Sequence, residues 1–362
     1  MTHRICTRCL VDDTAPVTFD MHGVCSYCRE YILYVKRIEE TGLYSRDALK
    51  KRLTEVRKLG EGCDYDCVLG ISGGVDSSFL CHLMKTWGLR PLLVHFDNGW
   101  NTDISICNIQ ALVDKTGFDL YTYVVDWKEF RELQKAYFRA SVIDVEVLTD
   151  HGLMATLYKE AKEFNIKTVV IGQNYTTEFI MPGSWNFYKW DLINIRAICE
   201  QFSSMPISSF PVYGALGLMG SEFNYFEPLQ FIQFNKEKAI RLLEQQYGWR
   251  RYSGKHYESA FTKFYQAYYL PVKFGIDKRR IHLSNLIWSG QMTRKEALYE
   301  LEKPLYGPHE LEIEKNFVLK KLGMSQKEWD TIMATPPVPH QSYACAPPEL
   351  ANAISKKIQR RK

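Results

Sequence analysis

The 362-residue sequence has no apolar run that approaches the roughly 20 residues needed to span a bilayer. Its opening segment, MTHRICTRCL, also lacks the apolar stretch of a secretion signal. We therefore expect a cytoplasmic protein that does not cross a membrane.

The chain also has little net charge. Its 46 Lys and Arg residues nearly balance its 42 Asp and Glu residues, which leaves a formal charge of +4. This balance predicts no bulk binding of nucleic acid, although basic residues gather near the C-terminus. The hydrophobic fraction of 46% and the length predict a globular chain of two or three domains with a substantial core.

Most of the ten cysteines are scattered, but four form two closely spaced pairs, Cys6-x2-Cys9 and Cys25-x2-Cys28. In a reducing compartment such pairs bind metal more often than they form disulfides. Two knuckles of this kind complete a tetrahedral site of four sulfurs that suits Zn²⁺, with an iron–sulfur cluster as the alternative. Since the protein supplies all four ligands, we expect a structural site. The other cysteines are interpreted as packing residues.

Four β-rich runs, each followed by an amphipathic stretch, occupy the middle of the chain. This alternation predicts an α/β fold, a parallel sheet with helices on both faces. The expected strands cover residues 66–71, 92–96, 120–125 and 168–171, and the expected helices begin near Asp76, Thr102, Lys128 and Gly152.

The first of these units contains the string VLGISGGVDSS, residues 68–78, which is neither G-x-x-x-x-G-K-[ST] nor G-x-G-x-x-G. It nevertheless has the parts of a phosphate-binding loop: a strand, a bend at Gly73 and Gly74, and a helix N-terminus. Asp76 beside a phosphate predicts a bridging Mg²⁺. A glycine-rich turn without a ligand is the alternative. The expected ligand-binding residues of this loop are Gly70, Ser72, Gly73, Gly74, Asp76, Ser77 and Ser78.

The Ser-Gly-Gly-x-Asp-Ser pattern resembles the PP-loop of the ATP pyrophosphatases. This resemblance implies a PP-loop, Rossmann-like fold that binds ATP, releases pyrophosphate and transfers the α-phosphorus, as AMP, to a substrate oxygen. It also implies that Phe96 and Asp97 lie near the adenosine and that Gly172 lies against its base or ribose. Asp97 and Gly172 both follow expected strands, at the sheet edge where ligands of such folds gather.

The pattern changes after the fourth unit. Residues 185–226 are irregular and rich in Ser, Pro, Gly and aromatics, and we interpret them as a substrate-side insertion or a packed connection. Beyond them, an N-cap at Asn235 and capping boxes at Thr293 and Ser325 predict a mainly helical last third. The expected domains are a Cys₄ module (1–35), an ATP-binding α/β domain (36–232) and a C-terminal substrate or partner region (233–362).

A dense block of basic and aromatic residues spans residues 248–294. Its aromatic stripe, at Tyr257, Phe261, Phe264, Tyr265 and Tyr268, has helical spacing and is expected to face the core. Its basic residues are either a solvated face or cations that neutralise a departing pyrophosphate. The catalytic candidates are Asp76 in the loop and, in this block, Lys255, His256, Arg279 and Arg280.

The strings GKHYES, FYQAYYLPVKFGIDKRR and SGQMTR, together with the Cys₄ pattern and the loop, resemble the N-acetyl sugar amidotransferases of bacterial surface-polysaccharide synthesis. The resemblance implies conversion of an acetamido group on a nucleotide-activated sugar into an acetamidino group. The acetamido oxygen would be adenylated, with release of pyrophosphate, and ammonia would then displace AMP.

Ammonia is usually generated from glutamine, yet the sequence has no convincing glutaminase segment, and its second residue is Thr rather than the N-terminal Cys nucleophile of one glutaminase class. We therefore expect a separate glutaminase subunit. The resemblance also implies a cyclase-like subunit that could channel ammonia.

Two other functions remain open at this stage. A PP-loop tRNA thiolase would also combine cysteine knuckles with this ATP site, but it would favour reactive cysteines near the site. A non-catalytic, nucleic-acid-binding zinc ribbon would require a degenerate loop, whereas the loop residues are intact.

Overall fold

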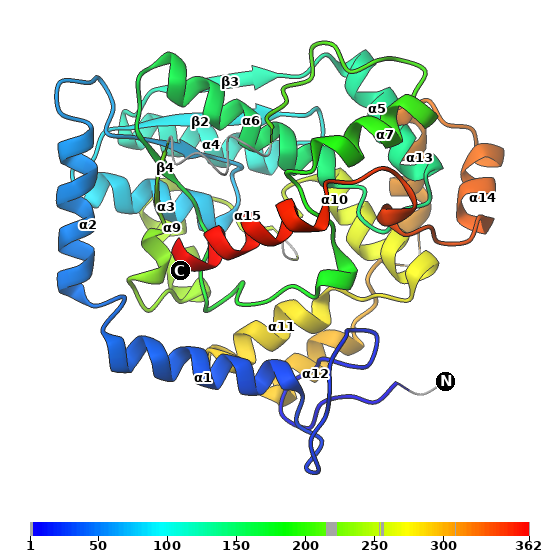
Figure 1. Cartoon of the computed structure of the whole chain (residues 1–362), viewed down its shortest axis with the longest axis horizontal. Coiled ribbons are helices and arrows are strands. Elements are labelled where there is room, and N and C mark those ends of the chain that lie inside the picture. The colour runs from blue at the N-terminus through cyan, green and yellow to red at the C-terminus, as the bar shows by residue number, and fades with distance from the viewer. Residues whose placement is uncertain (1–2, 215–222, 253, 255–256, 308, 362) are drawn as a thin grey trace.

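The computed structural model describes residues 3–214, 223–252, 254, 257–307 and 309–361. Its centre is a five-stranded sheet, in the order β3-β2-β1-β4-β5, in which every neighbouring pair is parallel (Figure 1). The strands are β1 (Cys67–Gly70), β2 (Pro91–Asp97), β3 (Leu120–Val124), β4 (Thr168–Val170) and β5 (Asn224–Phe226).

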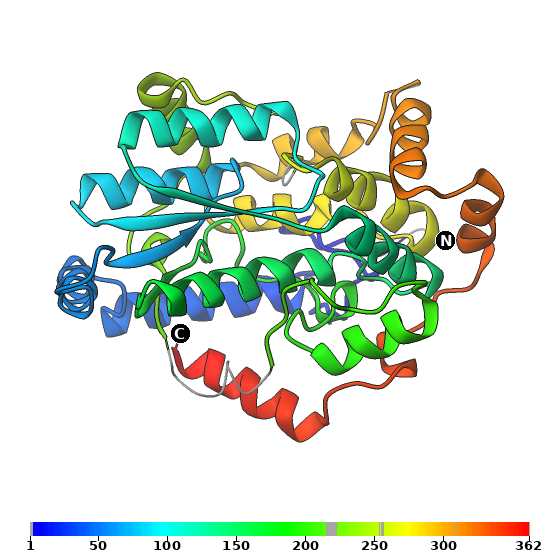
Figure 2. The same cartoon turned by 90° about the horizontal axis from the view of Figure 1, so that it is seen from above.

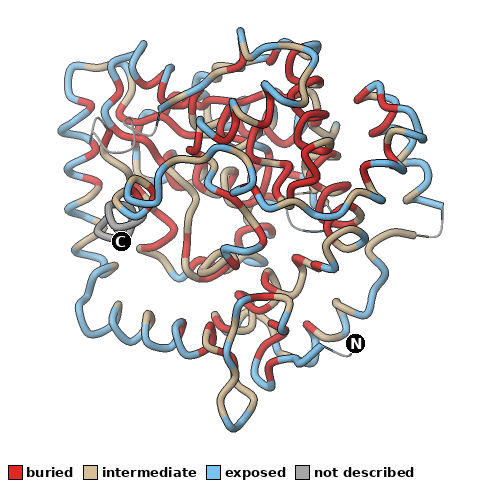
Figure 3. Tube along the Cα trace, turned by 45° about the vertical axis from the view of Figure 1, so that its right-hand side comes forward, coloured by how far each residue is buried: buried red, intermediate tan, exposed pale blue. Residues whose placement is uncertain are grey.

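Helices cover both faces of the sheet, as the alternating pattern predicts. On one side, α3 (Val75–Thr86), α4 (Asp103–Thr116) and α9 (Lys236–Tyr247) pack together, and on the other α6 (Val147–Glu163) contacts β1, β2 and β4 (Figure 2). This double cover explains why β1 and β2 are almost continuously apolar and buried, whereas the edge strand β3 is half exposed. Figure 3 shows buried residues concentrated in the interior of the fold and exposed residues along its outer helices.

The remaining α-helices include a long N-terminal pair and a C-terminal group that follows the sheet. They are α1 (Ser26–Thr41), α2 (Arg46–Leu59), α5 (Trp127–Arg139), α7 (Leu192–Phe202), α10 (Ala260–Phe264), α11 (Arg279–Trp288), α12 (Arg294–Glu302), α13 (Glu310–Leu322), α14 (Gln326–Ala334) and α15 (Pro348–Arg361). A π-helix, η3 (Tyr265–Phe274), follows α10 directly. Short 3₁₀ turns cover Gly183–Trp185, Pro228–Gln230 and His340–Ser342. The mainly helical last third is confirmed.

Two expectations about the elements were wrong. The helix expected near Gly152 begins at Val147. Gly152 lies inside this helix, at a position where a Cβ would come within 2.5 Å of the Phe96 ring. Residues 185–226 are also more regular than expected, since they contain α7 and the short strand β5.

The capping residues predicted the starts of helices better than the strand and helix patterns did. The Asn235 side chain accepts the backbone N–H of Lys238 (3.0 Å), and Thr293 forms the full capping box with Glu296. Only half of the second box forms: Ser325 accepts the Glu328 N–H, whereas the Glu328 carboxylate pairs with Arg139 at 2.7 Å.

The aromatic stripe of the basic block faces the core at three of its five positions. Phe261, Phe264 and Tyr265 are fully buried, while Tyr257 and Tyr268 are half-buried. The change from α10 to the π-helix at Tyr265 alters the helical register, so the regular spacing read from the sequence does not hold along the whole stripe.

Two buried histidines predict acid sensitivity. His340 Nδ1 donates to the Asn194 side-chain oxygen (3.0 Å), and His151 Nδ1 donates to the Lys189 carbonyl (2.8 Å). In each ring Nε2 accepts a backbone N–H, so the neutral form fits best, and burial lowers both pKa values to about 4.

Because these pKa values lie below the ordinary value of 6.5, the unfolded chain binds protons first as the pH falls. Stability should therefore decline from pH 6.5 to 4, by on the order of 2–3 kcal/mol per histidine. Urea unfolding across this range tests the expectation, and His340→Asn should flatten the dependence. If the free energy of unfolding of that variant depended on pH as in the wild type, His340 would not be a cause of the acid sensitivity.

Among the described helices, none is both long and apolar enough to cross a membrane.

Candidate functional site

The turn from β1 to α3 is shaped by two glycines, Gly73 and Gly74. Gly73 has a φ of +75°, and a Cβ there would lie 2.4 Å from the Ser105 carbonyl oxygen on α4. A Cβ on Gly74 would lie 2.6 Å from a carboxylate oxygen of Glu258. The loop is therefore held against α4 on one side and against the C-terminal region on the other.

Hydroxyl groups order the same loop from within. The Ser72 N–H donates to Ser77 Oγ (3.2 Å), and the Gly74 N–H donates to Ser72 Oγ (3.2 Å). The Val75 N–H, at the start of α3, points to the Tyr252 hydroxyl (3.3 Å). These amides and hydroxyls are gathered at a helix N-terminus, which is the arrangement that binds phosphate in other folds.

A cavity of about 240 Å³ opens beside this loop. Of the residues expected to bind ligand, it is lined by Gly70, Ser72, Gly74, Asp76, Ser77 and Gly172. Gly172 follows β4, and a Cβ there would meet Asp76 Cβ at 3.8 Å, so the ends of β1 and β4 meet at one sheet edge.

Four other expected residues do not line this cavity: Gly73, Ser78, Asp97 and Phe96. The Ser78 hydroxyl is buried and accepts Trp249 Nε1–H (3.1 Å), and Gly73 packs against α4. Asp97 accepts hydrogen bonds from the Gly99 N–H and the Asn101 side chain, both at 2.9 Å, and so shapes the turn after β2.

The charge of the first cavity is predominantly negative. Asp76, Glu178 and Glu258 line it, and Lys236 is the one cationic side chain among the described lining residues. Carboxylates facing a phosphate loop would repel a polyphosphate, whereas a hard divalent cation would bridge the two. The donor set therefore fits Mg²⁺ bound together with a phosphorylated ligand.

Sequence reasoning missed Glu258. Ser72 Oγ lies 3.4 Å from its carboxylate, and the Glu258 carbonyl accepts the Thr102 N–H (3.0 Å) at the start of α4. The string GKHYES contains this residue, but only the fold brings it to a loop 186 residues away.

A second cavity, of about 540 Å³, shares Ser72, Ser77 and Glu258 with the first. Phe96, expected near a nucleoside, lines this second cavity and stacks on Tyr123. The other lining side chains are mainly amides, hydroxyls and carboxylates, which include Asn98, Asn101, Glu146, Thr149, Asp150, Asn186, Ser259, Thr262 and Gln266. Lys189, Lys278, His95 and His282 add cationic or titratable groups.

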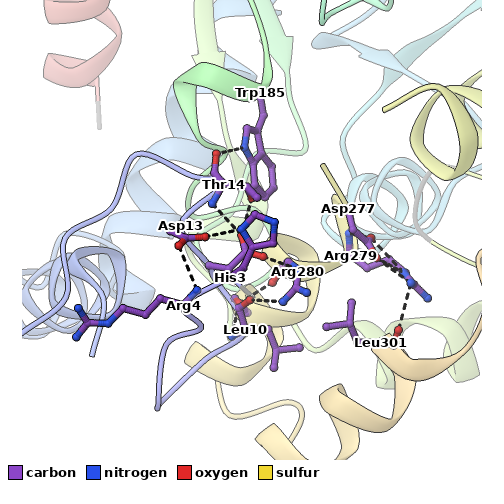
Figure 4. A network of polar contacts seen from close by, with 12 residues as sticks. His3, Arg4, Leu10, Asp13, Thr14, Trp185, Asp277, Arg279, Arg280 and Leu301 are labelled. Atoms are coloured by element: carbon purple, nitrogen blue, oxygen red, sulfur yellow. Dashed lines mark hydrogen bonds and ion pairs between the residues drawn. The ribbon is translucent and has the colours of Figure 1, made fainter. Parts of the chain in front are cut away.

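Of the four candidates in the basic block, the structure describes two, Arg279 and Arg280, and neither lines the cavity at the loop. Arg279 lines a third cavity, of about 520 Å³, and its guanidinium binds Asp277 (2.7 Å) and the Leu301 carbonyl (3.2 Å; Figure 4). Arg280 binds the buried carboxylate of Asp12 (2.9 Å) and lines none of the three cavities. Lys255 and His256 lie outside the described residues.

The four grouped cysteines form a buried cluster, with all sulfurs within 4.8 Å of one another. The Cys6–Cys28, Cys9–Cys25 and Cys25–Cys28 Sγ distances are 3.8, 3.7 and 3.7 Å. A disulfide would need sulfurs about 2.05 Å apart. A tetrahedron with Zn–S bonds of about 2.3 Å places its sulfurs roughly 3.8 Å apart, so the cluster fits such an ion.

Neighbouring groups also favour thiolate sulfurs. The Cys25 N–H points to Cys6 Sγ (3.2 Å), and the Trp288 indole N–H points to Cys28 Sγ (3.1 Å). The Trp288 contact comes from α11 and ties the cluster to the C-terminal region.

The Cys₄ module docks on the same helices through its backbone. The Leu10 N–H donates to Ser284 Oγ (3.0 Å), and Arg294 donates to the Cys6 carbonyl (3.2 Å). On the other side, Trp185 donates to the Thr14 carbonyl (3.1 Å; Figure 4). The module therefore braces α11 and the start of α12.

Comparison with solved structures returns proteins that are similar over parts of the fold. NMN synthetase from Francisella tularensis is 13% identical (TM-score 0.36) and covers 76% of this chain and 96% of its own. The NH3-dependent NAD synthetase from Campylobacter jejuni is 13% identical (TM-score 0.30) and covers 55% and 91%. A predicted subunit of tRNA methyltransferase from Methanocaldococcus jannaschii is 15% identical (TM-score 0.29) and covers 49% and 75%.

The sequence comparison is more specific. Residues 258–355 match the family described as LPS biosynthesis protein WbpG-like, C-terminal domain. The match begins at Glu258, the carboxylate beside the loop, and includes α10 to α14 and most of α15. No curated protein matches the chain. The C-terminal region of this protein is thus similar to proteins of LPS biosynthesis.

Proposed function

We propose that the protein is an ATP-dependent amidotransferase that converts an acetamido group on a nucleotide-activated sugar into an acetamidino group, as a step in the synthesis of a surface polysaccharide such as an O-antigen. One observation carries this proposal: the Ser-Gly-Gly-x-Asp-Ser loop opens both to a carboxylate-lined cavity and, through Ser72 and Ser77, to a larger cavity rich in amides and hydroxyls. The match of residues 258–355 to an LPS biosynthesis family supports the biosynthetic context.

ATP would lie along the edge where β1 and β4 end. Ser72, Gly74 and Ser77 would bind the phosphates that leave as pyrophosphate, and Gly172, which also lines the cavity, would lie against the nucleoside. Asp76 and Glu258 would hold Mg²⁺, which neutralises charge on the phosphates when it is bound.

The acceptor would occupy the second cavity. Amide, hydroxyl and carboxylate side chains can each pair with sugar hydroxyls, and Phe96 offers an apolar face for a sugar ring. An amide oxygen presented from this cavity would meet the α-phosphorus beside Ser72 and Ser77.

The reaction needs adenylation because an amide oxygen is a poor leaving group. The acetamido oxygen forms a bond to the α-phosphorus while the bond to the β-phosphate oxygen breaks, and the amide nitrogen loses its proton. Ammonia then adds to the carbon, and AMP leaves with the oxygen. The protein aligns oxygen with phosphorus and excludes water.

Ammonia would come from a separate glutaminase subunit, with a cyclase-like subunit that could guide it between the sites. On this proposal the isolated chain works with ammonium salts but not with glutamine, and the addition of a glutaminase partner restores glutamine use. Measured AMP release with each nitrogen source tests this. Equal rates with glutamine and with ammonium for the isolated chain would contradict it.

The cluster of Cys6, Cys9, Cys25 and Cys28 is proposed to hold zinc, which would fix the N-terminal module against α11. With four protein sulfurs around it, such an ion supplies structure rather than a position for substrate.

A tRNA thiolase is less well supported. No cysteine is found among the described residues that line the three cavities. Cys199, the one cysteine of the 185–226 segment, is buried, and burial raises its pKa to about 12. A thiol of this kind is a poor sulfur carrier.

Glu258→Gln tests the proposed cation site. Because it removes one of the carboxylates at the loop, we expect the Mg²⁺ concentration for half-maximal activity to rise about tenfold or more. Glu312→Gln, on the exposed side of α13, is the matched control. An unchanged Mg²⁺ dependence in the Glu258 variant would place the ion elsewhere.

The proposed function is tested by purified protein with ATP, Mg²⁺, an ammonium salt and nucleotide-linked acetamido sugars. We expect AMP and pyrophosphate in equal amounts, and only when the sugar is present. ADP or phosphate as the product would contradict the proposal.

A further inference from the structure

Lys278, the residue before α11, is a buried cation that forms no salt bridge to any residue that the structure describes. It is 7% exposed and lines the second cavity. Its Nζ lies 4.7 Å from the centre of the Tyr265 ring, and within the described part of the chain no hydrogen bond or ion pair to Nζ is found. By contrast, Lys189 Nζ in the same cavity is paired with Asp144 (2.7 Å) and Asp150 (3.1 Å).

A carboxylate, that of Glu146, lines the same cavity as the Lys278 ammonium. Glu146 stands at the N-terminus of α6, and its carboxylate accepts a hydrogen bond from the Thr262 hydroxyl. Burial raises the pKa of Glu146 and lowers the pKa of Lys278. Both shifts move the pKa values toward neutral pH, and a group whose pKa lies near the working pH transfers protons most effectively.

The other charged groups around this pair are already engaged. Asp144 accepts the Phe187 N–H (2.8 Å) in addition to Lys189, and Lys189 bridges Asp144 to Asp150. The other described contacts of the pair are uncharged: Thr262 of α10 is hydrogen-bonded to Glu146, and the ring of Tyr265 in η3 lies against Lys278. Among the described lining residues, Lys278 therefore places an ammonium without a salt bridge, and Glu146 a carboxylate, in the cavity that also reaches the loop serines.

Adenylation of an amide creates a need for this pair of charges. As the amide nitrogen loses its proton, negative charge collects on the oxygen that attacks the α-phosphorus. A base is needed for the proton, and a cation is needed near the oxygen and the phosphoryl group.

We propose that Lys278 and Glu146 activate the acceptor: Glu146 takes the proton from the acetamido nitrogen, and Lys278 contacts the oxygen that forms the bond to the α-phosphorus. The bond to the departing pyrophosphate breaks with its electron pair, and Glu146 later releases the proton to solvent. This inference rests on the proposed function and assigns two catalytic residues to it.

Lys278→Met is the first test, because it keeps the side-chain length and removes the charge. With ATP, Mg²⁺ and sugar acceptor we expect a fall of about 100-fold in acceptor-dependent pyrophosphate release, with unchanged ATP binding. Lys278→Arg should recover part of the rate. Lys273→Met is the control, since Lys273 donates to the Thr335 carbonyl (2.6 Å) and lines none of the three cavities.

Glu146→Gln is the second test, with a readout that a structural role would not change. The wild-type kcat/KM should rise with pH as Glu146 ionises, and the variant should lose this rise along with most of its rate. Wild-type rates in Lys278→Met, or a preserved pH profile in Glu146→Gln, would overturn the inference. Failure of the wild-type protein to release AMP with any sugar would instead refute the proposed function.

Discussion

Asp76→Asn should abolish ATP turnover while the protein stays folded. Asp76 lies in the first turn of α3 and lines the cavity at the loop together with Glu258. The amide is close to the carboxylate in shape but carries no charge to hold Mg²⁺ against a phosphate. We expect at least about a 1000-fold loss of AMP formation.

The stability cost of this substitution should be small. A carboxylate in the first turn of a helix contributes about 0.3–1 kcal/mol through the helix dipole. Asp103→Asn is a matched control, because Asp103 occupies the first turn of α4 and lines none of the three cavities. Thermal unfolding should shift equally in the two variants, and only the Asp76 variant should lose activity. A fully active Asp76 variant would remove this residue from the mechanism.

Removal of metal from the Cys₄ cluster should unfold the N-terminal module. The apolar core around the cluster includes the four cysteines themselves, so on the proposed zinc assignment the module would depend on the bound ion for its structure. Structural zinc contributes roughly 10 kcal/mol or more to folding in comparable sites. We therefore expect Cys9→Ser, or a strong chelator, to lower the unfolding temperature sharply.

Metal analysis and visible absorption provide the measurement. One zinc per chain without visible absorption is expected, whereas absorption typical of an iron–sulfur cluster would favour that alternative. Cys107→Ser is the control, because Cys107 is exposed and outside the cluster. Unchanged stability and metal content in Cys9→Ser would contradict the assignment.

The same experiment should affect activity through α11. One part of this helix contacts the Cys₄ module through Arg280, Ser284 and Trp288, and Lys278 immediately precedes it in the second cavity. Loss of the module should therefore reduce the rate of adenylation more than it weakens ATP binding.

The features that the sequence predicted well depend on residues that are near one another in the chain. The four central strands, the cap at Asn235 and the two cysteine knuckles are each encoded within a few residues. The loop glycines belong to the same group, since a bend between a strand and a helix is a local property.

The features that were missed depend on contacts between distant segments. Charge alone did not show that Arg280 faces Asp12, or that Lys278, two residues earlier, faces the second cavity. Ser78 was predicted to bind phosphate together with Ser77, which lines the cavity at the loop. One residue further along the helix, however, the Ser78 hydroxyl faces Trp249. Glu258 and Glu146 become recognisable only when α10 and α6 are placed beside the loop.

The most direct test of the account is mass spectrometry of the sugar product. Purified protein should be incubated with ATP, Mg²⁺, an ammonium salt and a panel of nucleotide-linked diacetamido sugars. The account predicts AMP, pyrophosphate and a sugar in which one oxygen atom is replaced by an NH group. If no sugar changes mass and AMP forms only with tRNA and a sulfur donor, the loop would still be an ATP site but the amidotransferase assignment would be wrong.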